Sequence, residues 1–299
     1  MRIASFLPSG TELVVALGAG GALVARSHEC DFPPWVAALP IVSRPTFDIH
    51  ANSAQIDQQV RARLSAGAPL YEIDEPLLAT LAPDVVITQT HCEVCAVSPR
   101  AIGAEYKRTQ VSCLVAGDIA GILAGYRLVA DAIGRQPECE RLIEGIQNKI
   151  HAAQESCTSL VRPKVVVVEW LDPVFVSGNW VPELVHIAGG CEVLGQAQSR
   201  STVMKWDDVC AADPDVLIVA PCGFDMARTR SELSSLTARP GFADLRAVRS
   251  NRCFVADGNL YFNRSGPNLF ETLQVLQQIL HPKTFVPSMR GQAWDALVA

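Results

Sequence analysis

Short apolar runs recur along this chain and alternate with stretches of helical period. Seven mostly apolar runs cover residues 3–7, 22–26, 84–88, 112–116, 164–169, 215–220 and 253–256. Continuous apolar runs of this length are typical of strands that are buried on both faces of a parallel sheet. Their alternation with helical stretches predicts an α/β fold in which helices cover both faces of parallel sheets.

Two segments of the chain occur twice in the same order. Residues 11–18 (TELVVALG) resemble residues 182–189 (PELVHIAG), and residues 81–87 (LAPDVVI) resemble residues 212–218 (ADPDVLI). Each copy is interpreted as a helix that follows a strand and, later, a short helix, a Pro-Asp turn and a buried strand. Two similar α/β lobes in one chain predict a cleft between them, where ligands usually bind.

A long helical region separates the two copies, and its only break is Gln136-Pro137. Asp118 suits a helix N-cap and Pro137 suits a first turn, so we predict one long connector helix over residues 137–159. The offset between copies indicates about 40 additional residues in the first one. The predicted organisation is an α/β lobe over residues 1–118 with an insert at about 46–69, a helical connector over 119–160 and a second α/β lobe over 161–299. Within the insert, residues 53–65 are predicted to form an exposed helix.

Composition excludes several classes of partner. The net charge of −6 and the pI near 5.5, without any run of Lys or Arg, argue against a nucleic-acid or membrane-surface binder. The ten cysteines do not form the dense framework of a small secreted domain. Met1-Arg2 precedes the first apolar run directly, which leaves no room for the apolar core of a signal peptide. We therefore expect a cytoplasmic protein, or a periplasmic one if a leader precedes this sequence.

The strongest local cluster of reactive side chains is the segment THCEVC at residues 90–95, directly after a predicted strand. A second cluster, HECD at residues 28–31, follows another strand and is expected at the same sheet edge. Together they offer soft ligands for zinc or another thiophilic metal, namely His28, Cys30, His91, Cys92 and Cys95. The spacing is looser than that of a zinc knuckle, so the same residues also fit an ordinary cleft wall.

Four segments resemble the cobalamin-binding branch of the iron-siderophore and cobalamin periplasmic-binding-protein family. They are SFLPSGTE at residues 5–12, SHECDFPP at 27–34, DPVFVSG at 172–178 and the glycine pair at 189–190, and the similarity extends over nearly the whole chain. The resemblance implies two Rossmann-like lobes bridged by one long α-helix, a corrinoid or ferric chelate in the cleft, and delivery to an ABC importer. It also implies that Glu75 and Asp207 dock on the importer's permease. Their other interpretation is that they complement the dipole in the first turn of a helix.

A corrinoid ligand suggests roles for several residues. A neutral imidazole is a good axial ligand for cobalt, with His91 as the first candidate and His28 as the second. Aromatic rings give flat apolar surface to a macrocycle, and free N–H groups at a helix start accept polar groups. The candidate ligand-binding residues are Ser9, Gly10, His28, Phe32, Trp35, His91, Trp180, Tyr261 and Phe262.

The sequence carries no nucleophile elbow, no HExxH, no phosphate loop and no GxGxxG after a strand, so we predict no catalytic residues. The leading hypothesis is a monomeric, non-catalytic binding protein for cobalamin or cobinamide, acting as a carrier or as the substrate-binding component of an ABC importer. One alternative is a zinc protein, or a corrinoid- or metal-processing enzyme, that uses His91, Cys92 and Cys95. Another alternative is a ferric-siderophore binder, which would use arginines to hold an anionic chelate. The available ones are Arg26, Arg44, Arg200 and Arg264.

Overall fold

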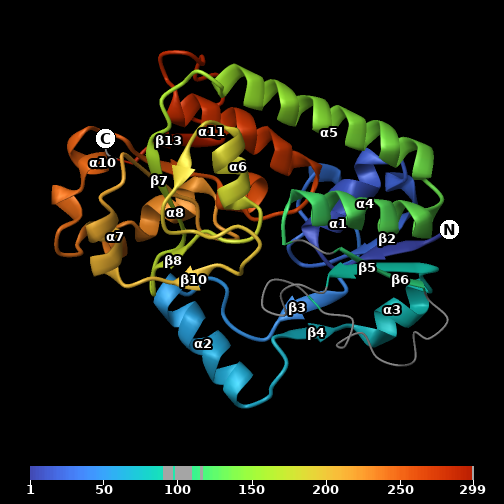
Figure 1. Ribbon diagram of the computed structural model, residues 1–299. Helices are drawn as coiled ribbons and strands as arrows, with labels where there is room; N and C mark the ends of the chain where they lie inside the picture. The colour runs from blue at the N-terminus through green and yellow to red at the C-terminus, as the bar shows by residue number, and fades with distance from the viewer. Residues whose placement is uncertain (90–96, 98–109, 115–116, 298–299) are drawn as a thin grey trace. The chain divides into compact units, whose positions relative to one another are not determined.

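The computed structural model describes residues 1–89, 97, 110–114 and 117–297. The chain forms two compact units (Figure 1). Unit 1 comprises Met1–Ala51, Gln55–Gly145 and Ser265–Pro267, and unit 2 comprises Asn52–Ala54, Ile146–Arg264 and Asn268–Ala299. The chain passes from unit 1 to unit 2 within helix α5 (Gln136–Cys157). Its bounds differ by at most two residues from those predicted for the connector helix, 137–159.

The sheet of unit 1 is parallel and has the strand order β2-β1-β5-β6. Figure 1 shows α1 and α4 on one side of this sheet and α3 on the other. Asp118 caps α4 as predicted, since its Oδ1 accepts a hydrogen bond of 2.7 Å from Gly121 N. The main elements are β1 (Ile3–Ser5), α1 (Pro8–Ala16), η1 (Gly20–Ala22), β2 (Leu23–Arg26), η2 (Pro34–Ala38), α3 (Glu75–Leu81), β5 (Val85–Gln89), β6 (Gln110–Leu114) and α4 (Ile119–Ile133).

The predicted insert forms a small subassembly. Its helix α2 (Ser53–Ser65) has the predicted bounds, and it is flanked by the antiparallel pair β3 (Ser43–Pro45) and β4 (Tyr71–Ile73). The sequence did not predict these strands, because three residues are too short for a recognisable apolar alternation.

The sheet of unit 2 has the order β10-β8-β7-β11-β12-β13, and β9 pairs with β7. The parallel core of β7, β11 and β12 was predicted, whereas the short strands around it were not. Among the described residues none of the helices is long and apolar enough to cross a membrane. The elements are β7 (Lys164–Trp170), β8 (Phe175–Val176), α6 (Val181–Ile187), β9 (Cys191–Glu192), β10 (Thr202–Val203), α7 (Trp206–Ala212), β11 (Val216–Val219), α8 (Met226–Glu232), α9 (Ser234–Thr237), η4 (Phe242–Asp244), α10 (Arg246–Arg249), β12 (Cys253–Ala256), η5 (Gly258–Phe262), η6 (Pro267–Glu271), α11 (Thr272–Leu280) and β13 (Trp294–Ala296).

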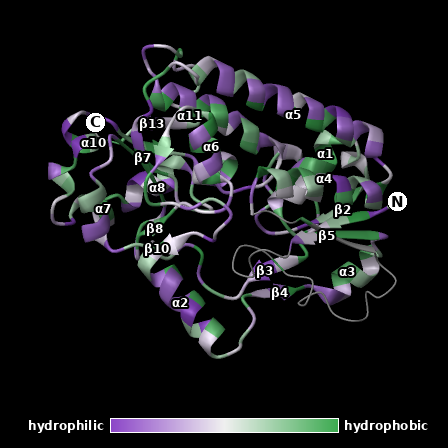
Figure 2. Cartoon of the chain, in the orientation of Figure 1, coloured by the Kyte–Doolittle hydropathy of each residue, from purple (hydrophilic) through white to green (hydrophobic). Residues whose placement is uncertain are grey.

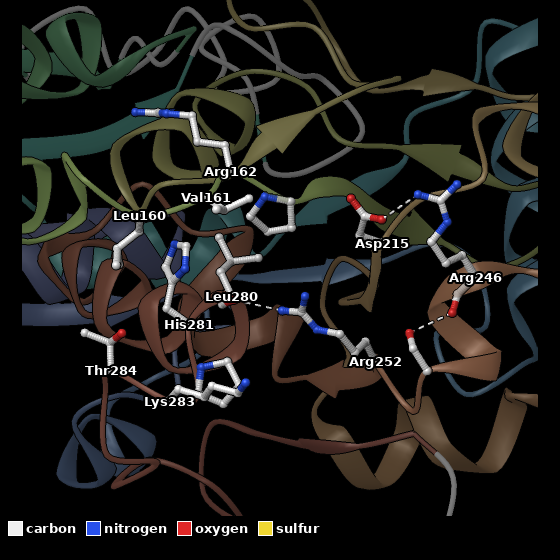
Figure 3. Close-up of a pocket in the computed structure, with 13 residues that line it drawn as sticks. Leu160, Val161, Arg162, Asp215, Arg246, Arg252, Leu280, His281, Lys283 and Thr284 are labelled. Carbon is white, nitrogen blue, oxygen red and sulfur yellow. Dashed lines mark hydrogen bonds and ion pairs between the residues drawn. The ribbon is translucent and has the colours of Figure 1, made fainter.

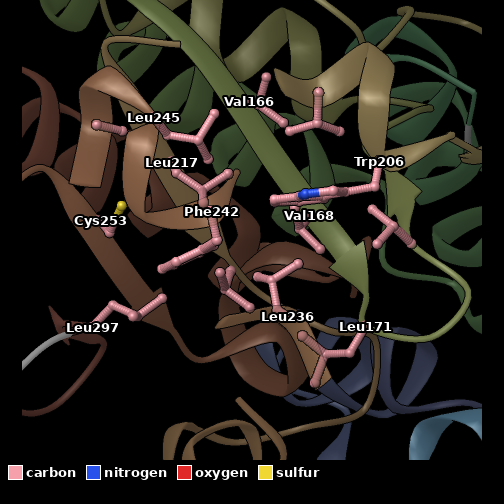
Figure 4. Close-up of a cluster of buried hydrophobic side chains, with 14 of the residues drawn as sticks. Val166, Val168, Leu171, Trp206, Leu217, Leu236, Phe242, Leu245, Cys253 and Leu297 are labelled. Carbon is pink, nitrogen blue, oxygen red and sulfur yellow. The ribbon is translucent and has the colours of Figure 1, made fainter. Parts of the chain in front are cut away.

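One face of the unit 2 sheet is covered by an apolar cluster (Figure 4). Val166 and Val168 of β7 and Leu217 of β11 are fully buried there, together with the stacked rings of Trp206 and Phe242. Burying a side chain of this size contributes roughly 1.5–3 kcal/mol, so this cluster is a main source of stability for unit 2. Figure 2 colours the chain by hydropathy and shows that the strands are hydrophobic and that α2 is largely polar.

The repeated segments form the same backbone turn in each unit. Ala82 ends α3 and Asp213 ends α7 in the left-handed conformation, with φ of 41° at both residues. The following Asp84 and Asp215 each accept a hydrogen bond from the main-chain N–H at the start of the neighbouring strand, at 2.7 and 2.9 Å. The duplication predicted from sequence therefore extends to individual hydrogen bonds.

Candidate functional site

The carboxyl ends of β1, β2 and β5 meet at one edge of the unit 1 sheet, because these strands are parallel. Loops that leave this edge bind the ligand in open α/β sheets. Helix α1 begins beyond the end of β1, and His28 lies two residues beyond the end of β2. His91, Cys92 and Cys95, which follow β5, lie outside the described residues.

The side chain of His28 is only 13% exposed. Its Nδ1 lies 3.3 Å from Ser43 Oγ, and its ring centroid is 5.5 Å from that of Tyr71. Its Nε2 is buried without a hydrogen-bond partner among the described residues, 3.9 Å from Glu29 Oε1. Burial lowers the pKa of His28 to about 4, and the charge of Arg26 adds to this against the opposing hydrogen bond at Ser43. The imidazole is therefore neutral at pH 7, which is the form that ligates metals, although neighbouring side chains must move to expose Nε2.

Within the described residues, His28 and Cys30 do not form a metal-binding group, and the role of Cys30 as a ligand beside His91, Cys92 and Cys95 stays a prediction. The Cys30 thiol is fully buried, with its sulfur 3.1 Å from Thr11 Oγ1 and 3.3 Å from Ser27 Oγ. It therefore acts as a packed core residue. Over the part of the chain that the structure describes, no three His, Cys, Asp or Glu side chains gather into a metal-binding group. A zinc site that uses His91, Cys92 and Cys95 stays a prediction.

Helix α1 starts at the carboxyl end of β1 without a side-chain cap, with Leu7 as its N-cap and Pro8 in its first turn. The next residues, Ser9 and Gly10, are both buried. A Cβ at Gly10 would lie 2.6 Å from Ile87 Cγ2, so glycine is needed for the close approach of α1 to β5. The packing of the helix thus explains Gly10 without a ligand, and a ligand at this edge would meet main-chain N–H groups.

The two aromatic residues predicted as ligand contacts in the first lobe, Phe32 and Trp35, are partly exposed, and Trp35 lies away from His28. Phe32 and Trp35 both keep exposed ring surface. Trp35 lies over Gly20, where a Cβ would be 3.2 Å from Trp35 Cζ2. Gly20 precedes β2, so Trp35 lies toward the opposite end of that strand from His28. The structure therefore does not bring Trp35 to the predicted site.

The aromatic residues predicted as ligand contacts in the second lobe pack inside unit 2, and their role toward a ligand stays a prediction. Trp180, Tyr261 and Phe262 are all buried within unit 2. Trp180 Nε1 donates a hydrogen bond of 2.9 Å to Phe262 O, and Thr272 Oγ1 donates one of 2.7 Å to Tyr261 O. Both Tyr261 and Phe262 belong to the helical turn η5 (Gly258–Phe262).

The carboxyl edge of unit 2 contains a buried carboxylate pair that the sequence analysis missed. Glu192 is held by two main-chain N–H groups at Oε1, Leu194 N at 3.1 Å and Gly195 N at 3.0 Å, and it also accepts from Ser177 Oγ. Glu169 is the last residue but one of β7 and accepts a hydrogen bond from Ser201 Oγ. Burial raises the pKa of Glu169 to about 7, and the charge of Glu192 adds to the rise. A glutamate at the end of the run KVVVV was the available signal.

Beside Glu169, the edge of unit 2 presents an aromatic and cationic group. The rings of Trp170 and Phe224 lie 5.2 Å apart, and the guanidinium of Arg228 lies 4.7 Å from the Phe224 ring centroid. Trp170 Nε1 donates to Ser53 O at 3.2 Å, so this ring is already held by the first turn of α2. Trp170 follows a predicted strand and offers the flat apolar surface that was assigned to other aromatic residues.

Glu75 and Asp207, the predicted docking residues, are exposed in equivalent places. Glu75 is the first residue of α3, and Asp207 lies in the first turn of α7. Each helix precedes the strand that follows the repeated Pro-Asp turn. Both positions fit a dipole-complementing acid and an accessible docking residue equally well.

Known proteins share this architecture. The sequence profile of the periplasmic binding protein family matches residues 3–260. The chain belongs to this family. A curated relative from Bacillus subtilis (strain 168), the uncharacterized ABC transporter substrate-binding lipoprotein YvrC, is 21% identical over 95% of this chain and 81% of its own length.

Two solved structures illustrate the fold. A periplasmic heme binding protein from Pseudomonas aeruginosa superposes with a TM-score of 0.72 and 20% identity, covering 95% of this chain and 93% of the other. The periplasmic vitamin B12 binding protein BtuF of Vibrio cholerae superposes with a TM-score of 0.66 and 17% identity, covering 93% and 96%. These similarities confirm the predicted fold class, a two-lobed α/β protein of the periplasmic-binding type.

Family membership also corrects one prediction. The expected cytoplasmic location is wrong, because the family is periplasmic and the Bacillus relative is named a lipoprotein. Both findings point to an extracytoplasmic location. The expectation relied on the residues that precede the first strand, and these do not determine the compartment.

Proposed function

We propose that this protein is the substrate-binding component of an ABC importer and that it carries a cobalt corrinoid, either cobalamin or cobinamide. The family and the name of the Bacillus relative support the importer role. The solved relatives named for vitamin B12 and for heme support a flat metal-containing macrocycle as the class of ligand.

The neutral His28 is the observation that most supports a metal-containing macrocycle as the ligand. It lies at the carboxyl edge of the unit 1 sheet, and its Nε2 has no hydrogen-bond partner among the described residues. An imidazole held neutral by burial can replace water as an axial ligand of cobalt or iron without first losing a proton. His91, which follows β5 in the sequence, is the other candidate for this role.

Titration with aquocobalamin tests the proposal. Replacement of the cobalt-bound water by imidazole shifts the visible bands of the corrinoid, so we expect a saturable shift with the wild-type protein. His28→Ala or His91→Ala should abolish the shift, whereas His151→Ala, at an exposed position of α5, should retain it. The same titration with hemin separates the two macrocycles. A shift with hemin alone would replace the corrinoid by heme, and no binding of either compound would refute the macrocycle proposal.

Docking on a permease is a separate part of the proposal. Glu75 and Asp207 are exposed at the first turns of equivalent helices, where arginine side chains of a partner can reach both carboxylates. We expect Glu75→Arg and Asp207→Arg to leave aquocobalamin binding unchanged and to reduce uptake at least about tenfold, because like charges then oppose each other at the contact. Glu144→Arg, at an exposed position of α5, is the control. Normal uptake by both docking variants would contradict this assignment.

A further inference from the structure

A cavity of about 660 Å³ lies at the amino edge of the unit 2 sheet (Figure 3). Its walls include Pro163, Asp215 and Arg252, which directly precede β7, β11 and β12. The remaining walls come from the segment after α5, from α10 and from the end of α11. Ligands of α/β sheets bind at the carboxyl edge, so this cavity is a second and separate feature of unit 2. Its volume lies within the usual range for small-molecule sites.

The charge around the cavity is predominantly positive. Its lining carries one carboxylate, Asp215, and four basic side chains, Arg162, Arg246, Arg252 and Lys283. Arg246 binds Asp215 at 2.9 Å and the adjacent Asp213 at 3.1 Å, so these three groups together leave one negative charge against the three other cations of the lining. Within the described residues, Arg162, Arg252 and Lys283 form no ion pair with a carboxylate. The cavity therefore has an uncompensated positive field.

Arg252 is the basic residue best placed for recognition of an anion. Its Nη2 donates to the carbonyl oxygens of Ile279 at 3.2 Å and Leu280 at 2.8 Å, in the last turn of α11. The carbonyl end of a helix repels an anion, and Arg252 covers two of these groups. Its Nη1 and Nε make no hydrogen bond with the described residues, so N–H donors on two sides of the guanidinium are available to an anion, each as a single donor site, because Nη2 is occupied. A guanidinium held in this way suits a carboxylate or a phosphate.

One side of the cavity is apolar, with Val161 88% exposed at its rim and Leu280 buried, and one unsatisfied nitrogen lies beside it. Leu160, Val161 and Leu280 line it, and His281 lies among them in Figure 3. His281 is 9% exposed, and its Nε2 is buried without a partner of normal hydrogen-bond geometry among the described residues. The backbone of Gly189 lies close to that nitrogen, at a position where a Cβ would be 2.7 Å away. An apolar surface beside cations that form no ion pair within the described part of the chain suits a ligand that has both an apolar chain and an anionic group.

We propose that this cavity binds a small amphiphilic anion, with a carboxylate or phosphate group held by Arg252 and Lys283 and an apolar chain lying along Leu160, Val161 and Leu280. The proposal does not depend on the corrinoid or on the importer role. The cavity is lined by residues of unit 2 alone, whereas His28 lies at the carboxyl edge of the unit 1 sheet, so the two sites share no residue.

Calorimetric titration of the full chain tests the proposal with four probes: octyl phosphate, octanoate, inorganic phosphate and octanol. We expect octyl phosphate or octanoate to bind about tenfold more tightly than either inorganic phosphate or octanol, because only the amphiphiles use both walls. Which amphiphile binds more tightly distinguishes phosphate from carboxylate as the natural group. Prior saturation with aquocobalamin should leave these affinities unchanged.

Three variants locate the binding. Lys283→Gln should weaken binding of the amphiphile about threefold. Arg252→Lys should weaken it about tenfold, since lysine keeps the charge but cannot both cover the two carbonyl groups of α11 and donate to the anion. Arg249→Gln, at an exposed position of α10 that does not line the cavity, is the control. Thermal denaturation checks that Arg252→Lys remains folded. Equal binding of octanol, no binding of any probe, or unchanged affinity in both Lys283→Gln and Arg252→Lys would overturn the proposal.

Discussion

Both units contain the same Pro-Asp turn, but different side-chain hydrogen bonds stabilise it in each unit. In unit 1, the side chain of Asp84 is 60% exposed and accepts a hydrogen bond from Arg2 N. In unit 2, the side chain of Asp215 is 30% exposed and accepts from Lys164 N and also from Arg246 Nη1 at 2.9 Å. A repeated sequence thus retained its backbone geometry while its side-chain network changed.

The residue before the repeated proline explains the difference. Asp213 occupies this position in unit 2 and accepts hydrogen bonds from Arg246 N at 2.8 Å and from Arg246 Nη2. Ala82 occupies it in unit 1 and has no side chain that can accept. Arg246 therefore binds two carboxylates in unit 2, forming a clamp with Asp213 and Asp215. In the equivalent turn of unit 1, Arg2 Nε instead donates to the carbonyl oxygen of Leu81 at 2.6 Å, and no arginine side chain binds Asp84 among the described residues.

The two units also differ near the carboxyl ends of their equivalent strands β1 and β7. Val165 pairs with β11 as Ile3 pairs with β5, and counting onward from these partners places Glu169 where unit 1 has Leu7. Both residues are buried. Unit 1 therefore has a buried leucine beyond the end of β1, where unit 2 has a buried carboxyl group near the end of β7 whose pKa is raised.

The largest predicted effect concerns Glu169. Its pKa is about 7 in the folded state against 4.5 as the reference value, so the protonated form stabilises the fold below about pH 4.5 and this contribution is lost as the pH rises through 7. In urea denaturation, the free energy of unfolding of Glu169→Gln minus that of wild type should rise by on the order of 3 kcal/mol from pH 4.5 to 8. Glu144→Gln, an exposed position on α5, controls for the loss of one carboxyl group. A difference that stays flat with pH would contradict the burial argument.

The repeated aspartates should differ in importance. We expect Asp215→Ala to lower the free energy of unfolding by about 2 kcal/mol, because it leaves both Lys164 N–H and Arg246 without an acceptor. Asp84→Ala should cost about 1 kcal/mol, because its side chain is more exposed. Urea midpoints at pH 7 measure both losses. Equal losses would mean that the contacts of Arg246 with Asp215 do not contribute to the free energy of unfolding.

The clamp also predicts an acid-side difference. Burial alone would raise the pKa of Asp215, but the hydrogen bonds from Lys164 N and Arg246 outweigh it, so its pKa is lowered from 3.8. Hydrogen bonding to the backbone of Arg246 lowers the pKa of Asp213 most strongly, and the Arg246 charge adds to this. The ionised clamp therefore stabilises the fold above the unfolded pKa and is lost as the pH falls through the lower folded-state values. The destabilisation caused by Arg246→Gln should be full at pH 7 and should disappear in strong acid. A destabilisation that persists there would exclude charge as its cause.

The smallest predicted effect is at the left-handed residues. Ala82→Gly should raise the free energy of unfolding by about 0.5 kcal/mol, since glycine adopts a φ of 41° with less steric cost than alanine. Asp213→Gly relieves the same strain but loses the Arg246 contacts, so it should lower the free energy. Thermal denaturation of the two variants, compared with wild type, gives shifts of opposite sign if the side-chain network accounts for the difference between the units.

The local sequence determined much of this protein. Continuous valine-rich runs predicted β7 and β11, because buried parallel strands require apolar residues on both faces. Helical period and capping predicted α2 and α5, and the quoted motifs identified the family. The repeated Pro-Asp turns were recognisable because the chemistry of the turn lies within a few consecutive residues.

Only the tertiary structure decided which side chains are accessible and which meet. Trp180 and Phe262 are 82 positions apart, and their hydrogen bond exists because the fold brings a helix start against η5. The pKa of Glu169 depends on burial and on Glu192, which lies 23 positions away. The basic cavity likewise combines Arg252 with Lys283 and residues 160–163, from segments that no local pattern connects. Burial, ionisation and cavity shape are sums over distant neighbours, so they follow from packing and cannot be read from the residues alone.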